Sequence, residues 1–360
     1  MSKNVHIIGA GLLGGSIALA LAEAGWLVSL EDANSQLTEA SLAKLSMKNV
    51  ARSKEEVDVV IVAVPISTNK LAISNALNLY PNATVIDIAS VKTKSLPDVD
   101  MKNNRIDRFV STHPFAGKEL HGAENASVDL FKDRVWAICD GPYLSNTSKS
   151  IAEAIIRDCG SVAVDVDLSE HDEIVGLTSH LPQILSTLLS RELTQLSEND
   201  LLLSGNGLRD MTRLASSSAD LWSEIVVNNS QNIILFLERL EKSVNSFKSD
   251  VEKANFEQIK RYFVEGKLQR HKIPGKHGDS SKVYSRIEVQ ILDEPGELAR
   301  IFSIAHASNV NIEDVRINHA LGRNIAILEI YIFPEVAVNF AETLKREGCS
   351  VRSNVTQSDL

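Results

Sequence analysis

The chain has 360 residues, of which 44% are hydrophobic and 23% charged, and its formal net charge at pH 7 is -10. The composition is that of an ordinary globular protein, the length is enough for two or three domains, and the acidic balance argues against nucleic acid or an anionic membrane as the main partner. No apolar run approaches the roughly 18–20 residues that cross a bilayer and no secretory signal pattern is visible, so we expect a cytoplasmic protein without a membrane partner.

The three cysteines, Cys139, Cys159 and Cys349, are widely spaced. They offer neither a disulfide framework nor a zinc-ligand spacing. We therefore expect each to be a small, buried or half-buried apolar residue, and we expect no metal site.

A strand, a glycine-rich turn and a helix are predicted at the start of the chain. Residues 4–8 form the strand, and the helix follows over residues 16–24. Between them stands a G-x-G-x-x-G pattern, in which the first glycine allows a tight turn, the second lets a pyrophosphate approach and the third lets helix and strand pack closely. The positive end of the helix dipole would face the phosphate. We predict a dinucleotide site containing Gly9, Gly11, Leu12, Leu13 and Gly14; the alternative is a glycine turn in another kind of α/β protein.

A second strand, over residues 27–30, ends in Glu31 and Asp32. A carboxylate about 20 residues after the glycines can hold the adenosine ribose hydroxyls and would repel the extra phosphate of NADP. No Lys or Arg follows until Lys44, so we predict NAD, with Asp32 as the ribose ligand and a solvated strand end as the alternative. Val64 and Pro65, where the next strand ends, complete the predicted cofactor residues.

Short β-branched runs continue over residues 57–64, 84–88, 108–111 and 135–139, followed by a helix over 147–159 and a strand over 161–166. Strands that are apolar throughout and alternate with helices indicate a Rossmann-type, doubly wound parallel sheet covered on both faces. We predict a dinucleotide-binding domain over residues 1–167.

The pattern then becomes helical. From residue 169 to about 263 apolar residues recur at helical spacing, which predicts an all-α domain over 168–270. One helix, predicted over residues 221–247, is long for a small domain and suggests dimerisation. A polar linker over 271–283 precedes a β-rich module over 284–360, whose two βαβ-like passes predict a ferredoxin-like fold.

Two polar clusters follow strands of the predicted sheet, where ligands of such sheets bind. One contains Ser90 and the other His113. A histidine near its ordinary pKa of ~6.5 can accept a proton while a hydride leaves. The alternatives are a loop histidine bonded to backbone and a serine that caps a helix or turn.

The helical region holds two further candidates. His180 and Gln183 belong to the run Ser179-His180-Leu181-Pro182-Gln183, where a histidine on an apolar face is more often a satisfied core residue. The run from Arg209 to Arg213 could bind a carboxylate through a guanidinium, or could form a surface ion pair instead.

Taken together, these motifs resemble the prephenate/arogenate dehydrogenases of tyrosine biosynthesis in the version with a C-terminal ACT domain. The resemblance covers essentially the whole chain. It is carried by the glycine pattern and by four runs in order: Ala89-Ser90-Val91-Lys92, Thr112-His113-Pro114-Phe115-Ala116-Gly117, Ser179-His180-Leu181-Pro182 and Arg209-Asp210-Met211-Thr212-Arg213.

The resemblance implies a role for each matching residue. His113 would take the proton of the ring hydroxyl, Ser90 would share that hydroxyl, and Arg213 would hold a substrate carboxylate. His180, Glu119, Asp210 and Trp222 would line or support the pocket. The implied reaction is the oxidative decarboxylation of prephenate to 4-hydroxyphenylpyruvate with NAD, most simply by a homodimer.

One position departs from the family, because Gln183 stands where many members carry a second histidine. That residue lies near the substrate side chain in the resemblance, and a neutral amide suits the keto acid of prephenate or the amino acid of arogenate. The substrate therefore stays open between the two.

The C-terminal region resembles an ACT domain through Ile291-Leu292-Asp293-Glu294-Pro295-Gly296-Glu297-Leu298-Ala299 and Asn309-Val310-Asn311-Ile312. Such domains bind amino acids near the positions of Gly296 and Asn311, which implies L-tyrosine as a feedback effector; a dimerisation module without ligand is the alternative. Two other functions remain: a 3-hydroxyacid or 6-phosphogluconate-type dehydrogenase, which would rely on a lysine in the helical part, and a non-enzymatic sensor of NAD and an amino acid.

Overall fold

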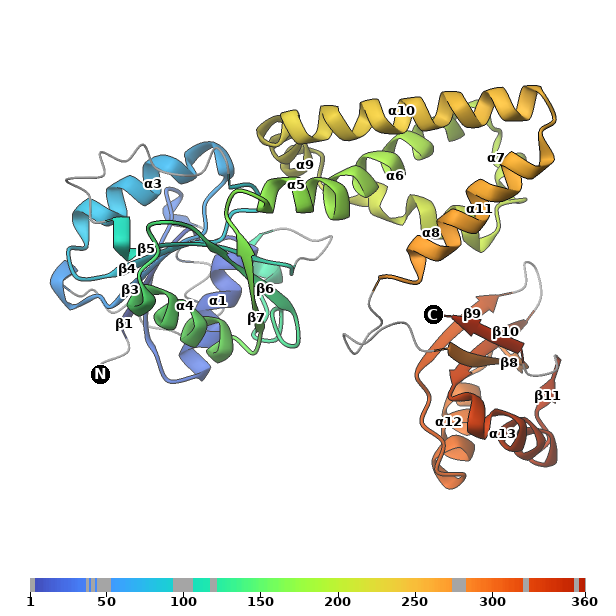
Figure 1. Cartoon of the computed structure of the whole chain (residues 1–360). Helices are drawn as coiled ribbons and strands as arrows, with labels where there is room; N and C mark the ends of the chain where they lie inside the picture. The colour runs from blue at the N-terminus through green and yellow to red at the C-terminus, as the bar shows by residue number, and fades with distance from the viewer. Residues whose placement is uncertain are drawn as a thin grey trace. The chain divides into compact units, whose positions relative to one another are not determined.

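The structure is a computed structural model that describes residues 4–36, 39, 43, 53–92, 106–116, 122–273, 283–319, 324–352 and 356–359 (Figure 1). The chain divides into two compact units, Met1–Glu241 and Lys242–Leu360, and each is described by itself. The domain boundaries expected from the sequence stay predictions.

The first unit is built on a seven-stranded sheet with the strand order β2-β1-β3-β4-β5-β6-β7. The order reverses between β1 and β3, which is the switch point where ligands of such sheets bind. The strands are β1 Asn4–Ile8, β2 Leu27–Glu31, β3 Val59–Val62, β4 Thr84–Asp87, β5 Phe109–Pro114, β6 Val135–Asp140 and β7 Val162–Asp167.

The direction of the strands confirms the predicted parallel sheet for β1 to β5, which pair in parallel throughout. The last two strands differ from the expectation. β6 pairs antiparallel with β5, and β7 is parallel to β6, so both run opposite to the rest. The loop between β5 and β6 contains no crossover helix among its described residues, and an antiparallel pair needs none.

Helices cover both faces of this sheet (Figure 1). Along β3 alternate residues point to opposite faces: Val59 and Ile61 belong to the core beneath α1 Leu12–Glu23 and α4 Asn146–Asp158. Their neighbours Val60 and Val62 belong to the core beneath α3 Ile66–Leu79. This two-sided burial explains why the strands read as continuous apolar runs.

Helices follow the sheet, as predicted. The chain passes from α5 His171–Val175 through a π-helical turn, Gly176–His180, into α6 Leu181–Glu192. The wide turn has a local cause, because Pro182 has no N–H to donate and its ring crowds the preceding turn. The helices that follow are α7 Glu198–Leu201, α8 Asn206–Thr212, α9 Ala219–Asn228, α10 Ser230–Glu252 and α11 Phe256–Arg270.

The prediction of one continuous helix over residues 221–247 is wrong in one respect. The segment forms two helices, α9 and α10, which are separated at Asn229. Asn229 leaves the helical conformation, and its side chain turns inward to bond the backbone of Asp172. Apolar periodicity continues across the break, so the sequence pattern alone did not reveal it.

In the second unit, the end of α10 and α11 form a helical hairpin. Phe247 contacts Tyr262 edge to face, with ring centroids 5.2 Å apart. One side of α11 is apolar yet exposed: Phe256 and Phe263 are each 70% exposed. These two residues line a shallow groove with Ile259 and Val264.

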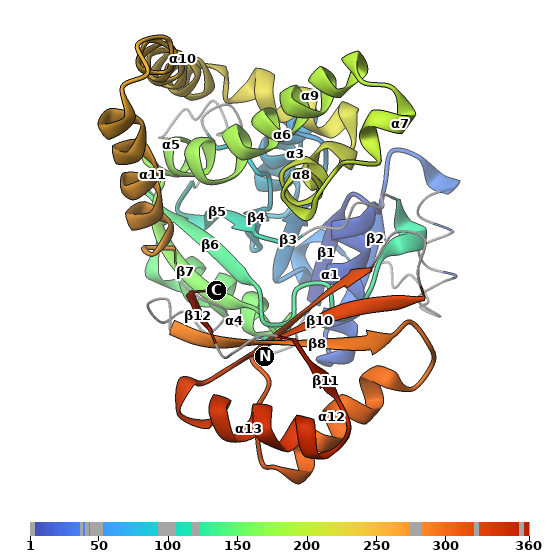
Figure 2. The same ribbon diagram turned by 90° about the vertical axis from the view of Figure 1, so that its right-hand side faces the viewer.

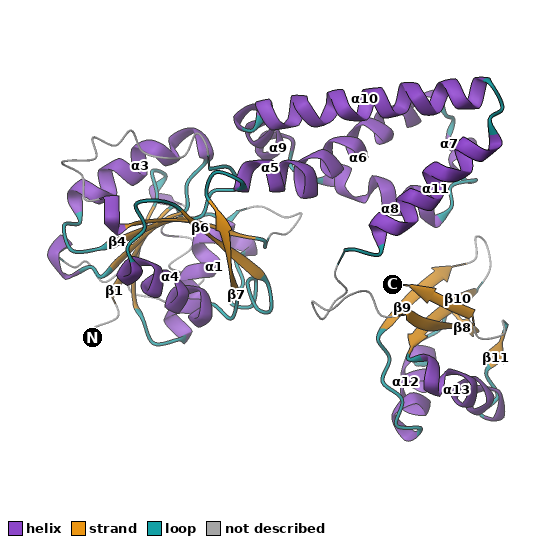
Figure 3. Ribbon diagram, in the orientation of Figure 1, coloured by secondary structure: helices purple, strands orange, loops and turns teal. Residues whose placement is uncertain are grey.

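The C-terminal part contains a small antiparallel sheet, as Figures 2 and 3 show. Two helices lie on one face of this sheet and bury a common apolar core with it. The strand order is β11-β8-β10-β9, with β12 also paired to β8. In chain order the elements are β8 Val283–Leu292, α12 Glu297–Ala307, β9 Asp314–His319, β10 Ile325–Ile332, α13 Pro334–Arg346, β11 Ser350–Val351 and β12 Thr356–Asp359.

All three cysteines are free and buried, which confirms the expectation for them. Burial raises the pKa of the Cys139 and Cys159 thiols to about 12, so both are inert thiols at neutral pH. Within the described part of the chain, no helix has both the length and the apolar character needed to cross a membrane.

Candidate active site

The glycine turn after β1 has the geometry that its sequence predicts. Gly9 has φ +108°, and a Cβ there would lie 2.3 Å from the carbonyl oxygen of Ala63. A Cβ on Gly14 would lie 1.9 Å from the carbonyl oxygen of Gly9. Both positions therefore exclude a side chain. Gly11, in contrast, has open space on its Cβ side and precedes α1 without any side-chain cap, so a pyrophosphate can approach the helix end there.

Asp32 lies directly after β2 and faces this turn. Its Oδ2 accepts a hydrogen bond of 2.8 Å from the backbone N–H of Ala10, and its Oδ1 accepts one from Asn34. Each oxygen retains a lone pair for a ribose hydroxyl. Glu31 is instead turned toward His6, at 3.4 Å. Across the switch point, Pro65 precedes the first turn of α3. The residues present thus fit a dinucleotide.

A buried ion pair lies under the ends of β4 and β5. The Nζ of Lys92 donates to Asp87 Oδ2 at 2.8 Å and also to the carbonyl of Thr112, and both charged side chains are at most 1% exposed. Asp87 also accepts hydrogen bonds from Asn69, from the backbone of Ala89 and from the backbone of Thr112. This network ties the loop after β4 to the strand that carries His113.

Ser90 lies on that loop, at the carboxyl end of β4. The residues on both sides of it, Ala89 and Val91, are buried together with Ile225 of α9, and Trp222 packs against the same cluster. Helix α9 therefore packs against the loop that carries Ser90. The predicted convergence of Ser90 and His113 on one sheet edge agrees with the pairing of β4 and β5.

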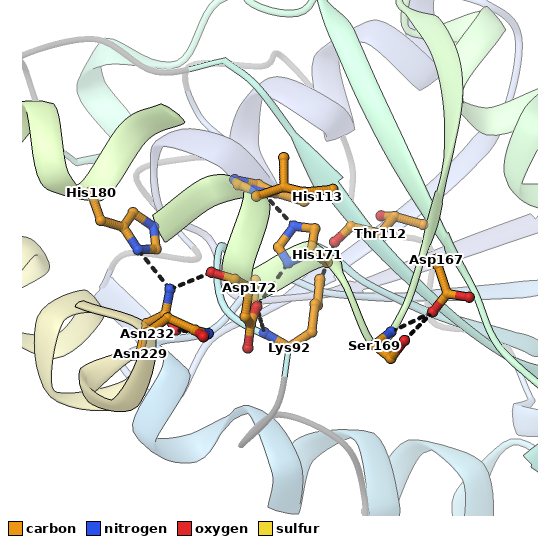
Figure 4. Close-up of polar contacts among 12 residues, drawn as sticks. Lys92, Thr112, His113, Asp167, Ser169, His171, Asp172, His180, Asn229 and Asn232 are labelled. Atoms are coloured by element: carbon orange, nitrogen blue, oxygen red, sulfur yellow. Dashed lines mark hydrogen bonds and ion pairs between the residues drawn. The ribbon is translucent and has the colours of Figure 1, made fainter. Parts of the chain in front are cut away.

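His113 lies at one end of a chain of polar contacts that runs through His171 to Asp172 (Figure 4). Its Nδ1 lies 3.0 Å from Nε2 of His171, and Nδ1 of His171 lies 2.8 Å from Oδ1 of Asp172. Burial holds the pKa of His113 well below its ordinary value, and His171, Lys92 and His180 lower it further, while Asp172 opposes them. His113 is thus a neutral imidazole that can accept a proton.

His180 ends the π-helical turn and is 1% exposed. Its Nδ1 lies 3.0 Å from the amide nitrogen of Asn229, which also donates to the carbonyl of Asp172 at 2.7 Å. The ring meets Trp222 edge to face, with centroids 5.9 Å apart. Burial lowers the pKa of His180 to about 4, so this histidine is neutral as well.

The remaining predicted substrate residues lie around the end of α8. Gln183 is 5% exposed, and its amide donates to the carbonyl of Leu214 at 2.7 Å. Gln183 therefore braces the segment that begins with Arg213. Arg213 and Asp210 are both exposed, and no described contact joins either of them to His113. Glu119 lies outside the described residues.

The two predicted effector residues belong to the C-terminal sheet. Gly296 precedes α12 with φ +100°, and a side chain there would meet no other atom within 4 Å. Asn311 is exposed and donates to Glu313. The effector role of both residues stays a prediction.

Sequence reasoning missed His171, Asp172 and Asn229, and it noted Lys92 only as part of a motif. His171 is 58 residues away from His113, and only an adjacent His-Asp pair marked it in the sequence. Asn229 was hidden inside a predicted helix. No cluster that could hold a metal ion occurs among the residues that the structure describes.

Comparison with known proteins gives a consistent result. A family model described as the nucleotide-binding domain of prephenate dehydrogenase matches residues 17–165, and one described as its dimerization domain matches residues 167–265. The chain is 26% identical over 330 residues to the prephenate dehydrogenase of Bacillus subtilis, a match that covers 88% of each protein.

Solved structures give the same picture. The prephenate dehydrogenase of A. aeolicus, in complex with hydroxyphenyl propionate and NAD+, is similar with a TM-score of 0.66 and 27% identity, over 76% of this chain and 99% of that one. An arogenate dehydrogenase from Synechocystis shares the fold, with a TM-score of 0.62 and 19% identity, over 75% of this chain and 99% of that one.

Proposed function

The chain belongs to the prephenate dehydrogenase family, and we propose that it converts prephenate to 4-hydroxyphenylpyruvate with NAD as the electron acceptor. The observation that carries this proposal is His113, a half-buried imidazole at the end of β5 beside the Ser90 loop, whose surroundings hold its pKa well below the ordinary value. The A. aeolicus relative supports it, because that enzyme binds NAD+ together with a phenol that carries a carboxylate side chain, a molecule of the same type as the proposed product.

The cofactor residues are proposed to be those of the turn and the switch point. Gly9, Gly11 and Gly14 would leave room for the pyrophosphate, and Asp32 would accept the ribose hydroxyls. Leu12 and Leu13, in the first turn of α1, and Val64 and Pro65, after β3, would border the dinucleotide. When bound, NAD supplies the acceptor for the hydride that leaves the ring carbon bearing the hydroxyl.

The protein would manage the proton and the orientation of the substrate. His113 would accept the proton of the hydroxyl, and Ser90 would share that hydroxyl. The bond between the ring and its carboxylate breaks, and carbon dioxide departs. The electron pair of the broken bond stays with the ring and makes it aromatic. Arg213 would bind a substrate carboxylate through its planar guanidinium. His180 and Trp222 would line the pocket, and we assign supporting roles to Asp210 and Glu119. Aromatisation makes the step effectively irreversible.

The test is the formation of NADH by the full-length protein with NAD and prephenate. We expect His113→Asn to keep NAD binding and to lose about 10²–10⁴-fold in kcat, the usual contribution of a positioned general base. The matched control is His306→Asn, on the exposed side of α12, which should leave kcat unchanged. Undiminished turnover by His113→Asn would remove His113 from the mechanism.

Arg213→Ala tests the substrate clamp separately. Because the guanidinium would bind the substrate in both ground state and transition state, we expect a raised KM for prephenate and a nearly unchanged kcat. An unchanged KM would take Arg213 out of the site.

Arogenate is the second candidate substrate, since Gln183 replaces a histidine that many relatives carry. The side-chain amide of Gln183 donates to the carbonyl of Leu214 and carries no charge. It therefore favours neither a keto acid nor an amino acid in the substrate. Turnover with arogenate alone, in the same assay, would replace prephenate as the substrate.

We also propose that residues 284–360 form a ferredoxin-like ACT domain that binds L-tyrosine near Gly296 and Asn311, after a helical substrate and dimerisation domain over 168–270. The βαββαβ order of β8 to β11 supports the fold. The exposed apolar face of α11 and the match to a dimerization domain support a homodimer. Calorimetry with L-tyrosine on the full chain and on a chain ending at the linker tests the effector. Equal binding of L-tyrosine by both forms would place the tyrosine site elsewhere.

A further inference from the structure

The contacts behind His113 form an unbroken path to a buried carboxylate. His113 meets His171 at 3.0 Å, and His171 meets Asp172 at 2.8 Å. His171 and Asp172 are 1% and 3% exposed, and they open α5, shortly after β7. Figure 4 shows His171 between His113 and Asp172, with Lys92 beside the carboxylate.

The three groups admit an arrangement of hydrogens that suits a proton acceptor. An ionised carboxylate only accepts hydrogen bonds, so Nδ1 of His171 donates to Asp172. When His171 carries this one hydrogen, its Nε2 accepts a hydrogen bond, and the donor is Nδ1–H of His113. Nε2 of His113 then has a lone pair for the substrate proton.

Asp172 is itself held in place from two further sides. Its Oδ1 accepts the backbone N–H of Lys92 at 2.8 Å, which joins it to the loop that carries Ser90. Its own carbonyl accepts from Asn229 at 2.7 Å, which joins it to the break between α9 and α10. The carboxylate thus connects the serine loop, the helical part and the histidine pair.

The charges around His113 give this path a second role. The groups that act on His113 are His171, Lys92, His180 and Asp172, and of these only Asp172 favours the protonated imidazole. The charge of Lys92 is matched by Asp87 at 2.8 Å. When His113 takes a proton, Asp172 is therefore the anion that stabilises the resulting cation, through His171.

We propose that His171 and Asp172 are positioning residues that set the tautomer of His113 and stabilise its protonated form during turnover. This inference rests on the proposed role of His113 in the dehydrogenase reaction. The arrangement is the one by which a buried carboxylate orients an imidazole base in hydrolases, with a second imidazole inserted between them. The two residues act through His113 and need not touch the substrate.

The first experiment observes the tautomer directly. The full-length protein is labelled with ¹⁵N-histidine, and long-range ¹H–¹⁵N spectra are recorded at neutral pH, with His113→Asn used to assign the His113 signals. We expect the hydrogen of His113 on Nδ1. A hydrogen on Nε2 would overturn the proposal. The measurement depends neither on turnover nor on a variant of His171 or Asp172.

The second experiment follows kcat and kcat/KM against pH with NAD and prephenate. Asp172→Asn keeps an oxygen that can accept from His171 and Lys92 but removes the charge. We expect kcat to fall about 10–100-fold, the rising limb of the kcat/KM profile to move to lower pH, and KM for prephenate to change less than about threefold. The control Asp165→Asn removes an exposed carboxylate that pairs only with Lys149 among described groups, and its profile should match the wild type.

His171 is tested by a pair of substitutions. His171→Leu removes the nitrogen that accepts from Nδ1–H of His113, and we expect kcat to fall about 10²–10³-fold. This loss is smaller than the roughly 10⁴-fold loss in a serine protease whose histidine base is held in the wrong tautomer. His171→Gln restores an acceptor oxygen and should recover at least about tenfold of that loss. Equal activity of the two variants, or an unmoved pH limb in Asp172→Asn, would overturn the proposal. A wild type without turnover on prephenate or arogenate would instead refute the proposed function, while the tautomer measurement would still stand.

Discussion

The buried ion pair between Lys92 and Asp87 provides a prediction about stability. Lys92→Met keeps most of the side-chain volume and removes the ammonium group. The substitution leaves the carboxylate of Asp87, which is fully buried, without its cationic partner, and it leaves the carbonyl of Thr112 without its donor.

The expected loss follows from what remains around the carboxylate. Removing one partner of a buried ion pair costs about 3–5 kcal/mol. Asp87 keeps the N–H donors of Asn69, Ala89 and Thr112, so we expect the lower end of that range. For a domain of this size each kcal/mol lowers Tm by about 2–4 °C, so a loss of about 3 kcal/mol corresponds to about 6–12 °C.

The assay is thermal and urea unfolding followed by circular dichroism, with Lys132→Met as the control. Lys132 is exposed in the same unit, and its substitution should change the free energy of unfolding by less than about 0.5 kcal/mol. In the double variant with Asp87→Asn the uncompensated charge is gone, so the loss should be smaller than the sum of the two single losses. A loss below about 1 kcal/mol for Lys92→Met would refute the reasoning that the pair is buried and coupled.

Three further predictions concern other parts of the molecule. The pKa of His180 falls from its ordinary 6.5 to about 4 on folding, so the unfolded chain binds more protons than the folded chain between these pH values. The contribution of His180 to the free energy of unfolding should therefore be constant above about pH 6.5 and fall as the pH drops toward 4. His180→Gln should flatten this slope in unfolding experiments. Gly9→Ala places a Cβ 2.3 Å from a carbonyl oxygen at φ +108°, so NAD affinity measured by calorimetry should fall at least about tenfold, whereas unchanged binding would exclude this turn from the site. Phe263→Glu puts a charge on the exposed apolar face of α11 and should shift the protein from dimer to monomer in analytical ultracentrifugation; a dimer of unchanged stability would place the subunit interface elsewhere.

Local patterns in the sequence were enough to predict much of the fold. Continuous β-branched runs predicted the strands of the first unit. The G-x-G-x-x-G pattern predicted a turn in which Gly9 and Gly14 have no room for a side chain. The rule that ligands bind beyond strand ends selected Ser90 and His113. These signals are short in range, because they depend on residues within one strand, turn or helix.

Only the tertiary structure revealed what surrounds those residues. His171 lies 58 residues from His113, and Asp172, which accepts the backbone N–H of Lys92, lies 80 residues from Lys92. Nothing in the local sequence pairs a histidine on β5 with one at the start of α5. The reversal of β6 and the break at Asn229 were also invisible, because neither interrupts the apolar period that predicts strands and helices. The sequence by itself determined which elements form and which side chains stand at their ends. The tertiary structure decided which of those side chains meet, because hydrogen bonds and buried charges depend on distances that are set only when the elements pack.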